Sequence, residues 1–329
     1  MNVCVTGGAG MIGSALVKSL VKQGHQIVVI DNLWRGKMSH LEVNGASLID
    51  VEKDFYQIDL SDLSFATKLV EIFDAVETVI HLADIVAGIG YVFSNEYEIF
   101  RVNNLINTAV FKSFSDSQAK QIIYVGTACS FPLELQQGLD SELQEHMLFP
   151  ANPESAYGWS KLVGQLELKY LKQSSGKAVS TLMLHNVYGP NCEFTGERTQ
   201  VIPSLMKRVI DADEGDTISV WGSGNQGRAF IHVDDIVNAL VNCVGRDDLP
   251  EFMQVGPGVC TSIRQLIETI IEVSGKSLKV SYDTTKPEGD KGRYADYSIA
   301  QTHIGWTPKV TLKEGLAQTY RWIESADGK

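Results

Sequence analysis

Short apolar runs alternate with helical patterns over the first half of the chain. Each apolar run has the length of one strand, and between the runs lie stretches in which apolar residues recur at helical spacing. We expect strands at residues 3–6, 26–30, 55–58, 78–82, 122–125 and 180–184, and helices at 11–22, 61–73, 96–114 and 154–171. This alternation predicts an α/β fold with a doubly wound parallel sheet that is buried on both faces. Ligands of such sheets bind at the carboxyl ends of the strands.

After about Asn186 the pattern becomes irregular. Helical patterns at residues 201–211, 234–244, 261–274 and 312–324 are mixed with short apolar runs at 218–221 and 229–232. They predict a smaller C-terminal lobe of mixed α/β structure over residues 186–329, beside a first domain over residues 1–185. A segment near residues 252–256 is expected to return to the first domain and complete its sheet. The polar stretch 283–296 is expected to be a loop.

Composition limits the partners and the location of the protein. The chain has 329 residues, with 28 Lys and Arg against 40 Asp and Glu and a formal net charge of −12. An acidic chain without a basic block is a poor candidate for binding nucleic acid or an anionic membrane, and no apolar run approaches the ~18 residues of a membrane span. The five cysteines are scattered, with no CxxC and no zinc spacing. We therefore expect a cytoplasmic protein with free thiols and no metal site.

Glycines between the first strand and the first helix form a candidate phosphate-binding loop. Gly7 permits a tight turn, Gly10 lets the backbone approach a pyrophosphate, and Gly13 lets the helix pack on the strand. Asp31 ends the second strand, where a carboxylate accepts hydrogen bonds from a ribose diol and repels a 2′-phosphate. The sequence therefore predicts a Rossmann domain over residues 1–185 that binds NAD, although the nearby Arg35 leaves some tolerance for NADP.

Further cofactor contacts are expected beside this loop and after the next strands. Asp59 closes the third strand, where its side chain can reach the adenine, cap the following helix at Ser61, or do both. The remaining candidates are Met11, Ile12, Asn32, Leu60, Leu82, Ala83 and Asn103.

Tyr157 and Lys161 are four residues apart on a predicted helix, so their side chains share one face. A lysine beside a tyrosine favours the phenolate and lowers the tyrosine pKa from its ordinary value of ~10. Tyr157 then becomes a base that removes a proton from a substrate hydroxyl while hydride passes to the nicotinamide of NAD. Thr127, at the end of the fifth strand, is expected to hydrogen-bond the same hydroxyl.

Six motifs follow one another along the chain: TGGAGMIG at 6–13, DN at 31–32, HLA at 81–83, YGWSK at 157–161, NVYGP at 186–190 and RAFIHVDD at 228–235. Together they resemble the extended short-chain dehydrogenase/reductase family of nucleotide-sugar epimerases and dehydratases, over essentially the whole chain. The resemblance implies a nucleotide-sugar substrate bound by residues 186–329. It also implies a homodimer through helices 96–114 and 154–171, which form a four-helix interface in many relatives.

Within this family, residues 88–90, 127–132 and 185–190 most resemble GDP-mannose 3,5-epimerases, with GDP-fucose synthases next. By this resemblance Asn186, Arg228 and Arg293 hold the sugar and diphosphate of the substrate, a role that suits the forked donors of arginine. Trp221 either lines the nucleotide-base pocket or fills the core. The remaining expected substrate contacts are Gly88, Gly90 and Gln200.

The reaction class depends on Cys129. Oxidation of a sugar at C4 acidifies the protons at C3 and C5, and a thiolate can remove or return one of them. In the resembled families a cysteine here is an acid/base, whereas a free cysteine is otherwise a small buried hydrophobe. Those families pair it with a lysine, where this chain has about Thr195, or with a histidine, where it has Gln200. Neither residue carries a proton in that way, so His185 and Glu193 are the candidates to replace them.

Three functions are compatible with these residues. The first is an NAD-dependent epimerase that works through a transient 4-keto sugar and Cys129, like a GDP-mannose 3,5-epimerase. The second is a 4-epimerase or C4 dehydrogenase that uses Thr127, Tyr157 and Lys161 alone, with Cys129 as packing. The third is an inactive NAD-binding scaffold, which the presence of both Tyr157 and Lys161 disfavours. A 4,6-dehydratase is disfavoured too, because those enzymes follow the threonine with an acidic pair and this chain has Ala128-Cys129.

Overall fold

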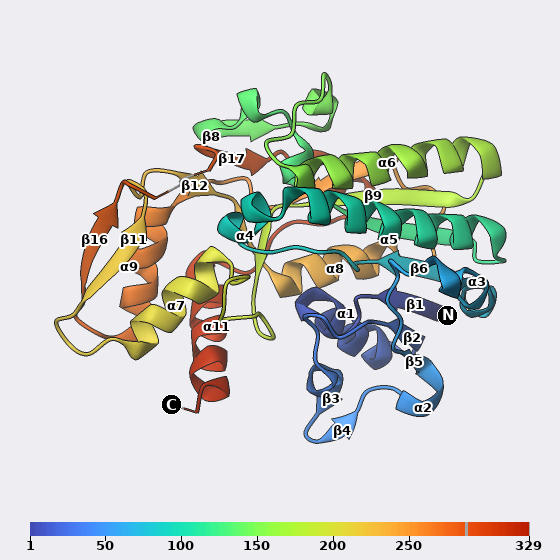
Figure 1. The fold of residues 1–329 in the computed structure, drawn as a ribbon, viewed down its shortest axis with the longest axis horizontal. Coiled ribbons are helices and arrows are strands. Elements are labelled where there is room, and N and C mark those ends of the chain that lie inside the picture. Colours follow the sequence, from blue (N-terminus) through green and yellow to red (C-terminus); the bar gives the residue numbers. More distant parts are fainter. Residues whose placement is uncertain (287–288, 329) are drawn as a thin grey trace.

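The computed structural model describes residues 1–286 and 289–328, which contain a seven-stranded parallel sheet with helices on both faces (Figure 1). The strand order is β14-β9-β7-β6-β1-β2-β5, and every neighbouring pair is parallel. The strands are β1 (Asn2–Thr6), β2 (Gln26–Ile30), β5 (Phe55–Tyr56), β6 (Thr78–His81), β7 (Gln121–Thr127), β9 (Ala178–Leu184) and β14 (Phe252–Val255). The order reverses between β1 and β6, which places a ligand crevice there. The predicted doubly wound Rossmann fold is confirmed.

Helices cover the two faces of this sheet in two groups. One face carries α3 (Ala66–Asp74), α5 (Glu96–Asp116) and α6 (Ala156–Ser175), and the other carries α1 (Met11–Lys22), α8 (Val233–Cys243) and α10 (Ser298–Ile304) (Figure 1). Successive side chains of β1 point to opposite faces, so Val3 and Val5 join the core under α1 and α8 while Cys4 joins the core under α3 and α5. Two apolar cores therefore fix the register of the sheet.

The second lobe has a core of its own, which includes Met206, Ile267 and Leu316. Its elements are α7 (Val201–Asp211), β11 (Thr217–Trp221), α9 (Ile263–Ser274), β16 (Lys279–Asp283) and α11 (Leu312–Ala326), and β11 pairs with β16 (Figure 1). Short strand pairs lie between and beside the lobes: β10 (Asn186–Tyr188) with β13 (Phe230–His232), β12 (Gly227–Arg228) with β15 (Thr261–Ser262), β17 (Gly292–Ala295) with β8 (Gln137–Leu143), and β3 (Glu42–Val43) with β4 (Ala46–Ser47). The remaining helices are α2 (Val51–Asp54) and α4 (Ile89–Ser94).

Several expected elements differ from the structure. The third expected strand, 55–58, ends at Tyr56, and the stretch 261–274 begins as β15 before α9 starts at Ile263. The stretch 283–296 was expected as a loop, but its last part is β17, because the backbone there pairs with β8; residues 287–288 lie outside the described residues. The helix expected from residue 61 begins only at Ala66, because the Asp62 carboxylate accepts a hydrogen bond from Ser64 N and starts a 3₁₀ turn instead.

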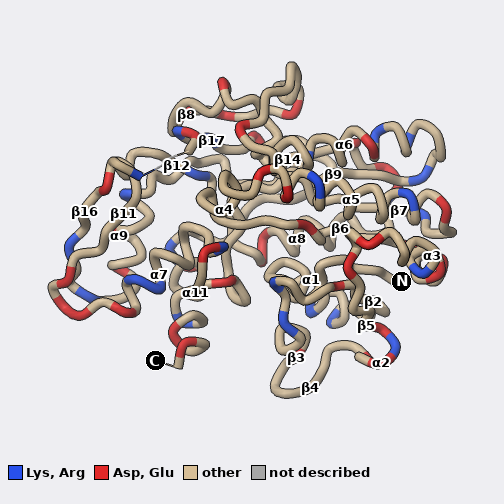
Figure 2. The backbone as a smooth tube through the Cα atoms, viewed as in Figure 1, with Lys and Arg blue, Asp and Glu red and all other residues tan. Residues whose placement is uncertain are grey.

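Charged residues of both signs are interspersed along the chain (Figure 2). None of the helices within residues 1–286 and 289–328 is long and apolar enough to cross a membrane.

Candidate active site

A cavity of about 560 Å³ opens at the carboxyl ends of the parallel strands. The glycine loop, the segments after β2, β6, β7 and β9, and parts of the second lobe form its wall. The predicted site residues in this wall are Gly7, Gly10, Met11, Ile12, Gly13, Asp31, Asn32, Asp59, Leu60, Leu82, Ala83, Thr127, Cys129, Tyr157, Asn186, Gln200, Arg228 and Arg293. The predicted site residues outside the wall are Gly88, Gly90, Asn103, Lys161 and Trp221.

The glycine loop has the close backbone contacts that a phosphate cradle requires. Gly7 has a φ of +71°, and a Cβ there would lie 3.0 Å from the Ala83 nitrogen. A Cβ on Gly13 would lie 2.1 Å from the Gly7 oxygen, so only glycine lets α1 pack this closely. Gly10 provides no side-chain cap for α1, which leaves N–H groups of its first turn free to bind an anion. These features fit the pyrophosphate of a dinucleotide.

Asp31 and Arg35 favour a cofactor without a 2′-phosphate. The Asp31 carboxylate accepts hydrogen bonds from Leu33 N at 2.8 Å and Ala9 N at 3.0 Å. Burial raises the pKa of Asp31, and these two N–H groups oppose that shift. Arg35 is held elsewhere, since its guanidinium lies 3.1 Å from the Glu193 carboxylate and donates to a backbone oxygen at 2.6 Å. Arg35, the residue that gave some tolerance for NADP, is therefore paired within the protein and is not free to bind a 2′-phosphate. The residues present fit NAD.

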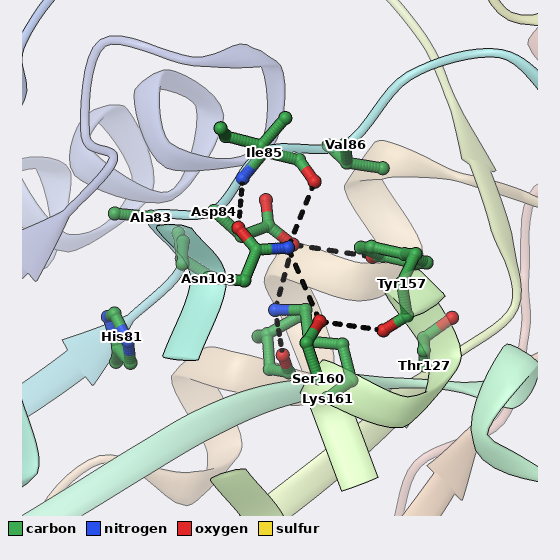
Figure 3. Close-up of polar contacts among 12 residues, drawn as sticks. His81, Ala83, Asp84, Ile85, Val86, Asn103, Thr127, Tyr157, Ser160 and Lys161 are labelled. Atoms are coloured by element: carbon green, nitrogen blue, oxygen red, sulfur yellow. Dashed lines mark hydrogen bonds and ion pairs between the residues drawn. The ribbon is translucent and has the colours of Figure 1, made fainter. Parts of the chain in front are cut away.

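Asp84 joins the Tyr157–Lys161 pair, and the sequence analysis did not single it out. It follows β6, and its Oδ2 lies 2.8 Å from Lys161 Nζ and 3.3 Å from the Tyr157 hydroxyl, which donates to it (Figure 3). Lys161 also donates to the Val125 oxygen at 2.8 Å. Lys161 is 2% exposed, so its ammonium group lies behind the cavity wall, against the Val125 oxygen of β7.

Asp84 opposes the pKa shift that Lys161 was expected to cause at Tyr157. Burial raises the pKa of Tyr157 well above its ordinary value, and Asp84 and then Cys129 raise it further. Burial has the largest single effect and lowers the pKa of Lys161, but Asp84 and Tyr124 together outweigh it and the net shift is upward. The prediction that Lys161 lowers the Tyr157 pKa is wrong for this arrangement, because the carboxylate balances the charge of the lysine. In this structure the Tyr157 hydroxyl donates a hydrogen bond to Asp84 Oδ2.

Buried polar groups hold the segment that carries Asp84. Asn103 accepts from Ile85 N at 2.7 Å and donates to Ile85 O at 3.1 Å, so it fixes the backbone of this segment (Figure 3). His81 lies 2.7 Å from the Thr6 hydroxyl through Nδ1 and 3.2 Å from an asparagine oxygen through Nε2. Burial, and then the charge of Lys161, lower the pKa of His81 to about 3, so this imidazole is neutral.

Cys129 contacts a buried arginine. Thr127 Oγ1 accepts a hydrogen bond from Cys129 N at 3.2 Å and sets the turn that presents the cysteine. Arg293 donates to the Cys129 sulfur at 3.3 Å, and it also donates to Asp290 Oδ2 at 2.6 Å and to Gln136. Burial lowers the pKa of Arg293, but Asp290 and then Cys129 outweigh burial, so the net shift is upward. A charged guanidinium group is therefore held against the sulfur.

Asp290 lies between the two arginines that the resemblance assigns to the substrate diphosphate. Arg228 lies 3.0 Å from Asp290 Oδ1 and donates to the Asp290 backbone oxygen at 2.9 Å. The Glu154 carboxylate joins this cluster by accepting from Asp290 N, and burial and then Asp290 raise its pKa. A diphosphate would have to compete with the chain's own carboxylates for these arginines.

The other predicted substrate residues differ in their surroundings. Gly88 donates to Arg198 O at 3.1 Å, and a Cβ there would lie 2.5 Å from the Thr199 oxygen, so its backbone is tightly packed against the loop before α7. A Cβ on Gly90 would meet open space. Trp221 is exposed in the second lobe, with Lys286 Nζ 5.8 Å from its ring centroid.

Glu193 and His185, the two candidates for a second acid/base, both line the cavity but differ in their partners. Glu193 is bound by two arginines, at 3.1 Å and 2.7 Å. His185 Nε2 lies 3.1 Å from the Gln254 side-chain oxygen, whereas its buried Nδ1 has no hydrogen-bond partner within residues 1–286 and 289–328. Because the Gln254 amide nitrogen donates to Leu143 O at 2.5 Å, its oxygen faces the histidine. Nε2 then carries the hydrogen, and Nδ1 keeps a free lone pair.

Residues 3–256 match the family model described as "NAD dependent epimerase/dehydratase family". The chain belongs to this family. It is 32% identical to "Putative GDP-L-fucose synthase 2" of Arabidopsis thaliana, over 98% of this chain and 91% of the relative. It is 27% identical to "GDP-mannose 3,5-epimerase 1" of Oryza sativa subsp. indica, over 98% of this chain and 82% of the relative. Membership confirms the prediction of an NAD-dependent enzyme of this family.

Solved structures of this family share the whole fold. UDP-glucose 4-epimerase of Thermotoga maritima with UDP-glucose has a TM-score of 0.85 and 26% identity, over 99% of both chains. UDP-glucose 4-epimerase of Thermus thermophilus in complex with NAD has a TM-score of 0.83 and 25% identity, over 99% of this chain and 100% of that one. The epimerase fold therefore extends through both lobes.

Proposed function

We propose that this family member is a nucleotide-sugar epimerase that acts on a GDP-linked hexose through a transient 4-keto sugar, as in GDP-mannose 3,5-epimerases. The observation that carries the proposal is the Arg293 contact to the Cys129 sulfur, in the wall of the cavity that also contains Tyr157. A cation at a thiol favours the thiolate, which is the form that removes a proton from carbon. A cysteine that served only as packing would not need a hydrogen bond from a charged arginine.

The proposed reaction uses these residues in sequence. NAD, held by the glycine loop and Asp31, would supply the hydride acceptor for C4. Tyr157, beside Thr127, accepts the proton of the C4 hydroxyl as the ketone forms. The Cys129 thiolate then takes a proton from the carbon next to the ketone, and reprotonation from the opposite face inverts that carbon. Tyr157 returns a proton to the C4 oxygen when the ketone is reduced.

For the second acid/base we propose His185 rather than Glu193. The Glu193 carboxylate is bound by two arginines, whereas the lone pair of His185 Nδ1 is unpaired. Burial, and then Arg293, lower the pKa of His185 to about 3, so its imidazole is neutral. His185 would exchange the proton on the face of that carbon opposite to Cys129.

The remaining sequence predictions form part of the proposal. Residues 1–185 would provide the cofactor contacts and residues 186–329 those to the nucleotide sugar. A homodimer would form through α5 and α6, which lie side by side (Figure 1). Their exposed apolar side chains, which a second copy would cover, are Tyr97, Phe100, Trp159, Val163 and Tyr170. A cytoplasmic location agrees with cysteines that are all free.

The test is incubation of the protein with GDP-mannose in D2O, with sugar analysis by mass spectrometry and proton NMR. Wild-type protein is expected to place deuterium at C3 or C5. Cys129→Ser is expected to lose that uptake about 10²-fold or more, because a general acid/base contributes at least that much. Cys260→Ser is the matched control, since this free thiol is also partly exposed and is absent from the cavity wall.

A 4-epimerase or C4 dehydrogenase is the second candidate. It is supported by the fold shared with UDP-glucose 4-epimerases and by Thr195 and Gln200, which stand where the resembled families have a proton carrier. Inversion or oxidation at C4 of GDP-mannose or UDP-glucose without deuterium uptake would establish this function and make Cys129 a packing residue.

A further inference from the structure

Arg35 bridges two segments that lie on either side of the glycine loop. In the sheet β1 lies between β2 and β6, and the glycine loop follows β1. Arg35, after β2, donates to the backbone oxygen of Val86, after β6, at 2.6 Å, and this bridge therefore spans the end of β1. Val86 is a firm anchor, because Asn103 holds the neighbouring Ile85 through its backbone N and O (Figure 3). The glycine loop, Arg35 and Val86 line the same cavity, so a dinucleotide bound by the loop would lie beneath the bridge.

A segment of the second lobe is fastened to this bridge, and we name its residues 191–198 the strap. Glu193 lies 3.1 Å from Arg35 and accepts a hydrogen bond from Arg198 at 2.7 Å. Arg198 also donates to the backbone oxygen of Trp34 at 3.1 Å, and its guanidinium group lies 4.4 Å from the centroid of the Trp34 ring. One carboxylate thus joins a strap arginine to the bridge arginine.

The two ends of the strap are tied to the first domain. Asn191 donates to the Ser14 hydroxyl of α1 at 3.1 Å, and the Arg198 oxygen accepts from Gly88 N at 3.1 Å. Asn191 has a φ of +65°, and Leu33, two residues before the bridge arginine, has a φ of +61°. Residues with side chains keep such left-handed conformations only where the surrounding contacts hold them. A few polar contacts therefore hold the strap closed against local backbone strain.

We propose that the strap is a gate for the cofactor and that Glu193 is its latch. The dinucleotide enters and leaves when Glu193 separates from Arg35 and the strap moves away from the bridge. This inference rests on the NAD dependence of the family and not on the proposed sugar chemistry. Glu193 is a positioning residue in it, because it acts by holding Arg35 and Arg198 together. A closed gate suits an epimerase, which uses the same cofactor for both hydride transfers, whereas a dehydrogenase must exchange its cofactor.

The exposure of the latch allows it to open. The side chains of Arg35, Glu193 and Arg198 are 22%, 19% and 29% exposed, so water can solvate these groups when they separate. The Lys161–Asp84 pair in the same cavity region is only 2% and 10% exposed, so its separation would leave buried charges. Opening of the strap breaks partly solvated ion pairs instead, which contribute less to stability than buried ones.

The first test is stopped-flow binding and release of NADH, followed by its fluorescence in the full-length protein without sugar. Glu193→Gln is expected to raise the association and dissociation rate constants together, each about tenfold, because the closed state loses a hydrogen bond between charged groups. The equilibrium dissociation constant should stay within about threefold, since a gate changes both rates alike. Loss of a negative charge from the cavity wall would by itself slow the release of anionic NADH, so it cannot imitate faster release.

Two outcomes of this test overturn the proposal. One is an unchanged or slower release of NADH from Glu193→Gln. The other is faster release with an unchanged association rate, which would make Glu193 a binding contact and not a gate. Glu197→Gln is the matched control, because Glu197 lies on the strap but is exposed and outside the cavity wall. Both of its rate constants are expected to equal those of wild type.

The second test locates the opening by hydrogen–deuterium exchange of the NAD-saturated protein. Glu193→Gln is expected to speed exchange in peptides that cover residues 86–90 and 191–199, because Gly88 N is bonded to the strap. Exchange in α9, within the core of the second lobe, should stay unchanged. Faster exchange throughout both lobes would indicate general loosening and would contradict a local gate. Neither test needs a sugar, so failure of GDP-mannose to react would count against the proposed function alone.

Discussion

Tyr157 and Cys129 both line the cavity, and each belongs to a set with one cation and one carboxylate. We name the sets the tyrosine triad, which is Tyr157, Lys161 and Asp84, and the cysteine triad, which is Cys129, Arg293 and Asp290. In the tyrosine triad the carboxylate lies in the middle and accepts from both partners. In the cysteine triad the cation lies in the middle and donates to both partners. A central carboxylate favours a proton on its partner and a central cation favours its removal, so the order of the groups sets the chemistry.

The largest expected effect comes from breaking the tyrosine triad alone. Tyr157→Phe removes the group that exchanges a proton with the C4 oxygen, so no ketone forms to acidify the neighbouring carbons. Both NADH formation and deuterium uptake are expected to fall about 10²- to 10⁴-fold. Alkylation of Cys129 by iodoacetamide, measured on the isolated peptide, is expected to stay within about twofold, because its cation is untouched.

Tyr56→Phe is the matched control, since this tyrosine lies on β5 and is not part of the cavity wall. If Tyr157→Phe left deuterium uptake intact, Cys129 would be acting without a ketone. The proposed reaction order would then be wrong.

The next effect is on stability, and it tests the carboxylate of the cysteine triad. Asp290→Asn leaves the buried Arg293 without its counter-ion, and their side chains are only 5% and 3% exposed. We expect the free energy of unfolding to fall by about 3–5 kcal/mol, measured by chemical denaturation. Asp248→Asn is the control, because its pair with Arg246 is at the surface, where the loss should be about 1 kcal/mol or less. Equal losses of unfolding free energy in the two variants would show that burial does not determine the contribution of the Asp290–Arg293 pair to stability.

A smaller effect is expected when the middle of the cysteine triad is changed. Arg293→Gln removes the charge at the sulfur and should slow Cys129 alkylation about tenfold, because a cation beside the sulfur favours the reactive thiolate. The alkylation rate of Arg293→Lys should lie between those of wild type and Arg293→Gln. Lysine keeps the charge but loses the forked guanidinium group that reaches Asp290 and the sulfur together. Arg35→Gln, a cavity arginine paired with Glu193, is the control. If Cys129 were alkylated at the wild-type rate in Arg293→Gln, the contact between Arg293 and Cys129 would be a packing contact only.

The tyrosine triad shows how far sequence spacing can predict a site. Tyr157 and Lys161 were found because four residues on a helix form one face, and the fold places that face beside β7. Asp84 lies 73 positions from Tyr157, outside any motif, and only the pairing of β6 with β7 brings it there. The available signal was its place, an acidic residue three positions after the end of a central strand. That position predicts a side chain at the ligand edge but not its partners.

The cysteine triad shows a different limit. The sequence identified Arg293 by resemblance and assigned it to the substrate. Its observed contacts with Asp290 and Cys129 depend on β17, which pairs with β8 within a stretch that composition predicted to be a loop. Such short strands carry little periodicity, because tertiary pairing rather than local pattern creates them. The α/β alternation, in contrast, is repeated along the chain, and it was sufficient to predict the main sheet.

The smallest expected effect concerns a neutral histidine near each triad. His81 lies near Lys161 and His185 near Arg293, and burial, followed by that cation, lowers both pKa values to about 3 from an ordinary 6.5. The unfolded chain therefore binds more protons than the folded one between these values. The stabilisation is complete above about pH 6.5 and is lost as the pH falls toward 3. Each histidine is expected to account for about 1 kcal/mol of lost stability between about pH 6.5 and 5.5.

Substitution of one histidine at a time distinguishes their contributions to the pH dependence of stability. His81→Gln and His185→Gln should each flatten the dependence of the unfolding free energy on pH by the share of one histidine. At neutral pH, His81→Gln should be less stable than His185→Gln, because His81 is bonded through both ring nitrogens and His185 through one. His303→Gln is the control, since this histidine is exposed. If neither His81→Gln nor His185→Gln changed the slope of the unfolding free energy against pH, other groups would cause the instability in acid. The histidines would then not distinguish the two triads.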